Sequence, residues 1–595
     1  MNNRKLEQAY LSHLEGLKAE EHRLKRKSRI FLYGKLLFFF LAVIQAYYGY
    51  VDDSGMKYGM SLGSFFLYLL VLVLDERCVG RIRRNRAVQK VYNGELSALH
   101  EDFSSFDGGA EFVNPQHEYA YDLDLFGEHS LFQRMNRTVT AVGKKRLADK
   151  FQHLSERRQE ISEYQEAIHE LSELSDWRFS FLSCPFVENG SSQIDGLLKK
   201  EKYGTLILNS VFPFLIVAST LIIFLLSICT VLPWSYFFLM FAVQIGITFS
   251  IGRLSSKIGR RTELLHKEFK GYLFLLESIE SACYHSRLLN RLKEHLFADK
   301  NSLKALRRLS VILNLFNQRS NEIMYVVLNG MFLFDVFLIR LYSRWAESYM
   351  DKVEGWLNDI AEIDALVSLG DYAHNHPQNT YATLMEEESD IVVQAEGIYH
   401  PFLRYEKAVP NDFVLRRSGV SIVTGANMAG KSTFLRTIGV SFVMASNGIP
   451  VCATAFSFSV VSLFSSMRTA DDLSKDISYF NAELLRLQQL VRYVKQKPFT
   501  LLILDEILKG TNSCDKLKGS VMFLEDITKC PVSVMVATHD LELSKLEEKR
   551  PDVFQNYCFE IDLSDQVTYT YKIQRGVAKN LNASYLLANI LKEIG

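Results

Sequence analysis

The chain has 595 residues, and its 68 lysines and arginines balance its 68 aspartates and glutamates, so its formal net charge is zero. This length is typical of roughly three or four domains. The charge balance argues against a protein that binds nucleic acid through an overall basic surface, but it does not exclude local basic patches. The eight cysteines form no C-x-x-C pair, which predicts free thiols in a reducing compartment and no structural zinc.

Four apolar runs in the first half of the chain each have about the length that crosses a bilayer. They are residues 30–50, 58–74, 205–228 and 233–251. Short loops join them in pairs, which predicts two helical hairpins, over 30–74 and 204–252. A charged segment, 1–29, precedes the first hairpin and is expected to be a cytoplasmic helix rather than a cleavable signal peptide.

Basic residues cluster outside both hairpins, within residues 23–29, 77–86, 199–202 and 253–261. The loops inside the hairpins carry almost no positive charge. Since positive charge stays on the cytoplasmic side, we expect four spans in the cell (inner) membrane, with the chain ends and the bulk of the protein in the cytoplasm. The alternatives are buried core helices of a large soluble protein, or basic flanks that bind nucleic acid.

Two helical segments, 75–203 and 253–385, flank the second hairpin and show the apolar spacing of amphipathic helices. Within the later segment, residues 322–342 are apolar enough to resemble a fifth span. This stretch carries Asp335 and Arg340, and Asn329 with Gly330 interrupts it. We therefore expect it to be a buried core helix.

From residue 386 to 595 the pattern changes to short β-rich runs that alternate with helices, which predicts an α/β domain with a mostly parallel sheet. The strand candidates are residues 420–424, 499–504, 532–538, 557–561 and 568–573.

A phosphate-binding loop of the form G-x-x-x-x-G-K-[ST] follows the strand candidate 420–424 and precedes a predicted helix. Two glycines let the backbone N–H groups turn toward a phosphate. The predicted nucleotide-binding residues are Gly425, Ala426, Asn427, Met428, Ala429, Gly430, Lys431, Ser432 and Thr433. Lys431 is expected to reach the β- and γ-phosphates of ATP, and the Ser432 hydroxyl to bind Mg²⁺.

Two further strand ends carry the side chains that a nucleotide hydrolase needs. Asp505 and Glu506 end a buried run; Asp505 is placed to hold Mg²⁺, and Glu506 to orient or deprotonate the attacking water. His539 follows another apolar strand and is a candidate sensor of the γ-phosphate. Ser478 precedes a helix, where it is either an ordinary N-cap or part of an anion site offered to a second subunit.

These motifs resemble the MutS family of mismatch-repair ATPases over about residues 392–591. The resemblance rests on the loop with Asn427 and Met428 and on several stretches that match in order: His400-Pro401, Pro410-Asn411-Asp412, Asp471-Asp472-Leu473, Phe480 with Glu483, Gly510-Thr511 with Asp515, Tyr571-Lys572 and Gly576-Val577-Ala578. A weaker match, around Asn136-Arg137-Thr138, Thr140, Gly143 and Leu147, resembles the start of the family's helical core.

The chain departs from the family in three ways. No Phe-x-Glu motif that would wedge into mismatched DNA stands near the N-terminus, where the first hairpin lies. The second hairpin interrupts the core where the family's levers extend toward DNA. The loop has Ala426 and Ala429 where the family usually has proline and glycine.

The expected architecture is an α/β P-loop (ABC-type) ATPase domain, preceded by an all-α MutS-like core and lever interrupted by two transmembrane hairpins. The resemblance implies a homodimer that hydrolyses ATP with Mg²⁺, with Ser478 of one subunit facing the other subunit's site. We expect a membrane-anchored switch that binds DNA and has no small-molecule substrate beyond ATP. The alternatives are a membrane ATP switch that remodels a non-DNA partner and, less favoured, a transporter.

Overall fold

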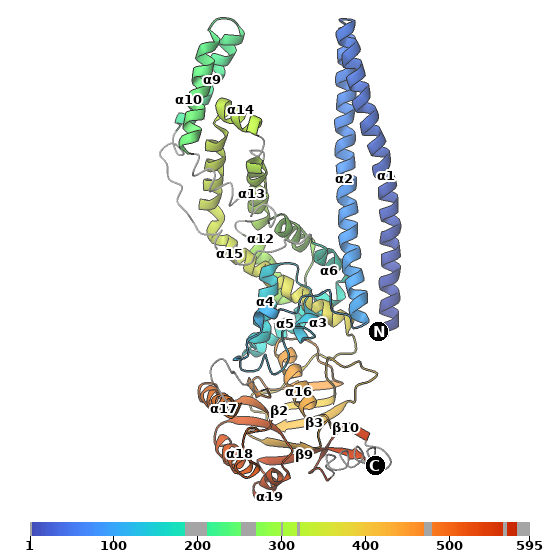
Figure 1. The fold of residues 1–595 in the computed structure, drawn as a ribbon, viewed down its shortest axis with the longest axis vertical. Helices are drawn as coiled ribbons and strands as arrows, with labels where there is room; N and C mark the ends of the chain where they lie inside the picture. The colour runs from blue at the N-terminus through green and yellow to red at the C-terminus, as the bar shows by residue number, and fades with distance from the viewer. Residues whose placement is uncertain are drawn as a thin grey trace, which may run out of the picture.

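The computed structural model describes residues 3–184, 211–251, 269–298, 301–317, 322–468, 479–562 and 568–579. The regular elements that it describes as far as residue 375 are helices, and a C-terminal α/β domain follows them (Figure 1). The longer helices of the first part are α1 (Asn3–Val51), α2 (Gly55–Leu99), α4 (Ala141–Gln152), α5 (Arg158–Glu173), α6 (Ser175–Leu182), α9 (Phe212–Ile228), α10 (Trp234–Ser250), α12 (Arg287–Phe297), α13 (Ser302–Asn317), α14 (Glu322–Phe332) and α15 (Phe334–Asn375).

The C-terminal domain is built on two sheets. Its strands are β1 (Thr383–Leu384), β2 (Ile391–Ile398), β3 (Asn411–Arg416), β4 (Val420–Gly425), β5 (Ala455–Phe458), β6 (Ser462–Ser466), β7 (Thr500–Asp505), β8 (Val532–Thr538), β9 (Phe554–Asp562) and β10 (Thr568–Arg575). A four-stranded sheet has the order β1-β5-β2-β3, and a six-stranded sheet has the order β10-β9-β4-β8-β7-β6. The larger sheet is parallel except for β10. Five of its strands occur where the sequence predicts them, whereas the edge strand β6 was not predicted.

Helices cover both faces of the larger sheet, since the side chains of a strand alternate between faces. Val423 and Ile503 pack with α16 (Lys431–Ser446) in the main core of the protein. Ile422, Leu502 and Leu504 point the other way and pack against α17 (Tyr479–Gln496) and α18 (Ser513–Ile527). Both faces of the strands are therefore buried, which explains their nearly continuous apolar sequences.

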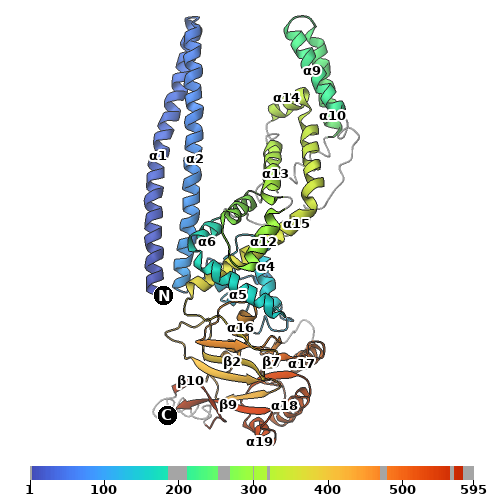
Figure 2. The ribbon, with the colours of Figure 1, turned by 180° about the vertical axis from the view of Figure 1, so that it is seen from behind.

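Two helical hairpins rise from the core in the same direction, away from the C-terminal domain (Figures 1 and 2). The hairpin α1–α2, called hairpin 1, has helices of 49 and 45 residues that continue without a break through the predicted boundaries at residues 29 and 74. The hairpin α9–α10, called hairpin 2, has helices of 17 residues each. Length and composition would let α1 and α2 cross a bilayer, whereas α9 and α10 are shorter apolar helices.

The prediction of one buried helix over residues 322–342 is wrong. The chain breaks at Leu333, whose φ is 49°, and α14 and α15 meet at a bend of 81°. The Asn329 side-chain oxygen accepts a hydrogen bond from the Asp335 N–H at 2.9 Å and so caps the first turn of α15. Most of α15 is buried as expected, but several apolar side chains of α14 are exposed.

Helix α15 is the spine of the molecule, because its 42 residues lead from hairpin 2 to the C-terminal domain (Figure 1). Helix α15 also contacts the segment that precedes α4. The buried Asp364 carboxylate accepts hydrogen bonds from the N–H groups of Val139 and Thr140 and from the Thr140 hydroxyl. A Cβ at Gly143 would overlap that carboxylate, which explains a glycine at this position.

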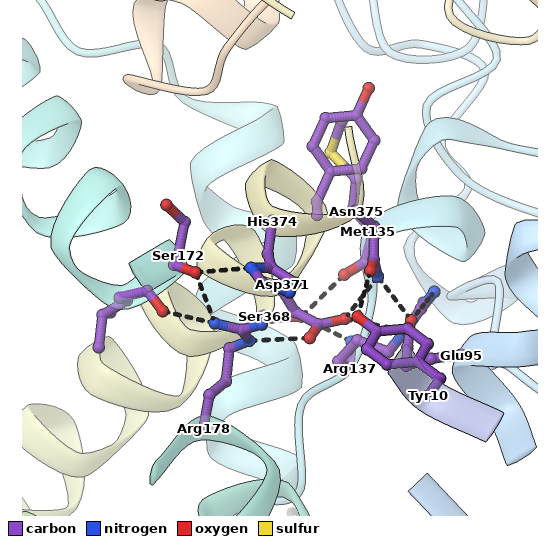
Figure 3. Close-up of polar contacts among 12 residues, drawn as sticks. Tyr10, Glu95, Met135, Arg137, Ser172, Arg178, Ser368, Asp371, His374 and Asn375 are labelled. Carbon is purple, nitrogen blue, oxygen red and sulfur yellow. Dashed lines mark hydrogen bonds and ion pairs between the residues drawn. The ribbon is translucent and has the colours of Figure 1, made fainter. Parts of the chain in front are cut away.

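A buried group of four ionisable side chains, which we call the junction network, joins this spine to hairpin 1 (Figure 3). The network consists of Glu95 on α2, Arg137, Arg178 on α6 and Asp371 on α15. Arg178 Nε lies 2.8 Å from Asp371 Oδ1, and Arg137 Nε lies 2.5 Å from Glu95 Oε1 and 3.8 Å from Asp371 Oδ2. All four side chains are at most 7% exposed, so each charge depends on its partners rather than on water.

Two neutral side chains extend the network to the base of hairpin 1. Tyr10 on α1 donates a hydrogen bond to Asn375 at 2.7 Å, and Asn375 donates one to Glu95 at 2.8 Å. Burial raises the pKa of Glu95 to about 7, whereas Arg178 and Arg137 outweigh the effect of burial and lower the pKa of Asp371. The base of hairpin 1 is thus bound to the end of α15, a few residues before the C-terminal domain begins.

Candidate nucleotide-binding site

The phosphate-binding loop connects β4 to α16 as predicted. Its backbone turns through three positive φ angles, at Gly425 (151°), Met428 (66°) and Gly430 (106°). A Cβ at Gly425 would lie 2.9 Å from the Phe559 carbonyl oxygen, so only glycine fits there without a shift. A loop with such alternating backbone conformations, at the N-terminus of a helix, presents N–H groups to an anion.

Lys431 is the first residue of α16, and its side chain folds back under the loop. Its ammonium group donates hydrogen bonds to the carbonyl oxygens of Gly425 and Ala426, both at 2.8 Å. Burial lowers the pKa of Lys431 to about 8, although Asp505 and Glu506 nearby oppose that shift. The lysine is therefore still charged at neutral pH and lies where phosphates would contact it.

Glu506 stands beside this lysine, directly after the last residue of β7. Its backbone has a φ of 59°, a conformation that costs a non-glycine residue about 1–3 kcal/mol and is typical of functional sites. One carboxylate oxygen accepts a hydrogen bond from Lys516 at 3.1 Å, and the other lies 3.1 Å from His539 Nε2. Burial raises the pKa of Glu506, but Lys516 outweighs the effect of burial and lowers the pKa, so the side chain is ionised.

His539 links the acidic strand end to the loop. Its Nδ1 lies 3.0 Å from the Gly425 carbonyl oxygen and 3.3 Å from the Lys431 ammonium group. Burial, and then the charge of Lys431, lower the pKa of His539, so the ring is neutral at pH 7. A neutral ring has a single N–H group. It can therefore donate a hydrogen bond either to the Gly425 carbonyl oxygen or to the Glu506 carboxylate, but not to both.

Strand order explains why distant residues meet here. The neighbours β4, β8 and β7 are parallel, so Gly425, Thr538 and Asp505 end at the same edge of the sheet. The fold thus brings Lys431, Glu506 and His539 together, while their chemical roles stay predictions. Ser478, which we expected at the facing side of a dimer, lies outside the described residues.

A cavity of about 540 Å³ opens beside the loop. Its lining includes loop residues, among them Asn427, Lys431 and Ser432. The more apolar part of the lining comes from Ile398, Tyr399, His400, Leu403, Val409, Phe559 and Tyr571. Burial lowers the pKa of His400 to about 4, so that ring is also uncharged. A lining that combines polar loop residues with apolar and aromatic side chains suits a ligand that carries both phosphates and a flat base.

The predicted magnesium ligands fit that ion chemically. The Ser432 hydroxyl and the Asp505 carboxylate are hard oxygen donors, and Mg²⁺ in nucleotide sites is usually held by one or two such groups together with phosphates and water. Ser432 lines the cavity, and Asp505 is near enough to stabilise the charge of Lys431.

Two contacts of the site were not predicted. Lys516 on α18 pairs with Glu506, and Glu483 on α17 accepts hydrogen bonds from the N–H groups of Lys509 and Gly510, both at 3.0 Å. Glu483 therefore fixes the loop that follows Glu506. Glu483 was noted only for its place in the first turns of the helix after Ser478 and for the resemblance, and nothing in the local sequence distinguishes Lys516 from its neighbours.

Comparison with known proteins agrees with this geometry. Residues 421–588 match the family model of MutS domain V. The similar proteins include the DNA mismatch repair protein MutS of Protochlamydia amoebophila, 31% identical over 239 residues, and that of Caldicellulosiruptor saccharolyticus, 31% identical over 240. The DNA mismatch repair protein spellchecker 1 of Drosophila melanogaster is 30% identical over 229 residues.

These matches cover 37–39% of this chain, and between 24 and 27% of each relative. The chain therefore spans about a quarter of the length of the relatives it matches, and that quarter is the α/β domain that holds the loop, the acidic strand end and the histidine. The C-terminal P-loop domain of this chain therefore belongs to the MutS domain V family.

Proposed function

We propose that this protein hydrolyses ATP at the site between the loop and Glu506. The observation that carries the proposal is the contact of Glu506 with both His539 and Lys516, beside a buried Lys431. Lys431 would bind the phosphates, Glu506 would orient or deprotonate the attacking water, and His539 would sense the γ-phosphate. Bound Mg²⁺, held by Ser432 and Asp505, would neutralise negative charge on the phosphates.

We further propose that both hairpins lie in the cell (inner) membrane and the α/β domain in the cytoplasm. Residues 211–251 contain no charged side chain, and large apolar side chains such as Phe238 and Leu225 are about 60% exposed. The apolar ends of both hairpins lie at the same end of the molecule (Figures 1 and 2). The exposure of such surfaces to water would be unfavourable, whereas lipid acyl chains would cover them.

Hairpin 1 carries the charges that such a placement requires. The basic residues of 23–29 on α1 and of 77–86 on α2 flank its apolar part on the side of the α/β domain, where anionic headgroups would attract them. Lys35, at the start of the apolar part, is paired with Asp75 at 2.5 Å, so neither charge would enter lipid alone.

The partner that we propose is DNA, bound by a homodimer that closes on ATP. The names of the relatives, DNA mismatch repair proteins, support this class of partner. One observation favours the second candidate, a switch that acts on a non-DNA partner: hairpin 2 ends in an uncharged apolar surface, which lacks the lysines and arginines that contact phosphates.

Fluorescence anisotropy of detergent-purified protein with homoduplex, mismatched and branched DNA, with and without ATP, tests the partner. DNA binding should be strong at low salt and fall steeply as salt rises. No binding at low salt would favour the non-DNA partner. Since no Phe-x-Glu motif stands near the N-terminus, we expect no preference for mismatched over homoduplex DNA, and such a preference would contradict this expectation.

A further inference from the structure

Helix α14 has an apolar surface that the rest of the described chain does not cover. Ile323 is 78% exposed, and Met324, Val326 and Val327 are 40–49% exposed. Residues 323–334 include no charged side chain. The opposite side of the helix is buried, with Asn329 fully covered. A helix of this kind, one side against protein and the other apolar and open, needs a covering partner.

The position of α14 identifies that partner. Gly330 packs directly against the Phe241 ring of α10, and a Cβ at Gly330 would overlap the ring. Helix α14 therefore lies directly against hairpin 2, whose own surface is apolar and exposed. At the start of α15, the Phe337 ring lies 4.8 Å from that of Phe214, near the end of α9 that faces the α/β domain. A cover that surrounds hairpin 2 would also reach α14.

The bend between α14 and α15 is built so that its polar groups need no water. Asn329 caps the first turn of α15 from within the protein, and Asp335 is fully buried beside it. Backbone groups that are satisfied internally are a condition for a broken helix at membrane depth. The first basic residue after the bend, Arg340, lies over the Phe214 ring at 5.3 Å, at the level expected for the lipid headgroups.

We propose that α14 lies in the lipid leaflet that faces the α/β domain, with acyl chains covering Ile323, Met324, Val326 and Val327. This inference rests on the proposed membrane insertion of hairpin 2. It makes α14–α15 a second connection between bilayer and ATP site, separate from hairpin 1, since α15 begins at the end of α14 and continues to the α/β domain.

The test is spin-label accessibility in the full-length protein, reconstituted in vesicles of phosphatidylethanolamine and phosphatidylglycerol. Cys229, Cys283, Cys514 and Cys530, the cysteines not buried among the described residues, are first replaced by serine. Single labels are then placed at Val326, with Ile323 as a second site on α14. Leu225 on α9 serves as the lipid reference and the exposed Lys352 on α15 as the water reference. ATP binding by each variant confirms that it is folded.

We expect labels at Val326 and Ile323 to be more accessible to oxygen than to a nickel chelate, as at Leu225, with the reverse at Lys352. If Leu225 is in lipid while Val326 follows Lys352, the inference about α14 fails although the membrane proposal stands. Protection of Val326 from both reagents would mean that a second copy or another protein covers it, which also overturns the inference. Exposure of Leu225 itself to the nickel chelate would overturn the membrane proposal.

Discussion

The protein contains two clusters of ionisable side chains, the junction network and the cluster around Lys431 and Glu506. They differ in their exposure and in the groups that surround each side chain. At the junction network the four side chains are nearly inaccessible, pair with one another and join helices far apart in sequence. At the candidate nucleotide-binding site Lys431 and His539 line a cavity, Lys516 and Glu506 are 21% and 16% exposed, and Glu506 stands on a strained backbone. The first arrangement suits a permanent joint, and the second suits a group that changes its contacts during a reaction cycle.

The largest effect should come from opening the permanent joint. Arg178→Met would leave Asp371 charged without its closest partner, and loss of one member of a buried pair costs about 3–5 kcal/mol of folding free energy. Thermal unfolding in detergent measures the change. Arg307→Met, which removes an exposed arginine paired with Glu277, is the matched control. A loss no greater than that of the control would show that the network contributes little.

The next largest effect should come from removing the positive charge beneath the loop. Lys431→Ala deletes the group that contacts the phosphates and should weaken ATP binding by about 100-fold or more, because hydrogen bonds to charged groups are worth about 1.5–3 kcal/mol each. Titration calorimetry measures the affinity. Unlike Arg178→Met, this variant should unfold at nearly the wild-type temperature. Lys529→Ala, at a surface lysine, should leave both quantities unchanged.

A smaller effect is expected at the residue that positions Glu506. Lys516→Met removes one hydrogen bond to the carboxylate and should lower kcat by about 10- to 100-fold, with little change in ATP affinity. The exposed Lys518, two residues further along α18, supplies the control variant Lys518→Met. Equal turnover in the two variants would show that Lys516 does not position Glu506.

The smallest effect is a pH dependence of binding. In the free protein the pKa of Lys431 is about 8, and contact with phosphate favours the charged form. ATP affinity should therefore be level below pH 8 and fall above it, by at most about tenfold per pH unit. Binding of a non-hydrolysable ATP analogue to the wild-type protein gives the profile without hydrolysis and leaves the neighbours of Lys431 unchanged. Affinity that rises above pH 8 would contradict the assignment.

The two groups of charge also differ in how far the sequence predicted them. The loop, the acidic strand end and His539 each follow a strand, and parallel strands place their ends together, so local patterns were enough to expect that they would meet. The junction network has no such pattern. Glu95, Arg137, Arg178 and Asp371 come from four separate segments, and only the packing of α2, α6 and α15 brings them into contact.

The same distinction explains the error at residues 322–342. Hydropathy identified an apolar helix and its interruption near Asn329, but not the left-handed Leu333 or the 81° bend. That bend depends on a cap from Asn329 to Asp335 and on Gly330 fitting against Phe241 of another hairpin. Contacts between elements, rather than the segment's own composition, decide its shape.

The central claim is that Glu506 serves the hydrolysis of ATP bound at the loop. The most direct test compares ATP affinity and steady-state turnover in wild-type protein and in Glu506→Ala, with Glu506→Gln as the variant closest in shape. Affinity should change by less than a factor of about three, while turnover should fall by about 100- to 10,000-fold, the range for loss of a general base. Turnover equal to that of the wild type in both variants would contradict the account.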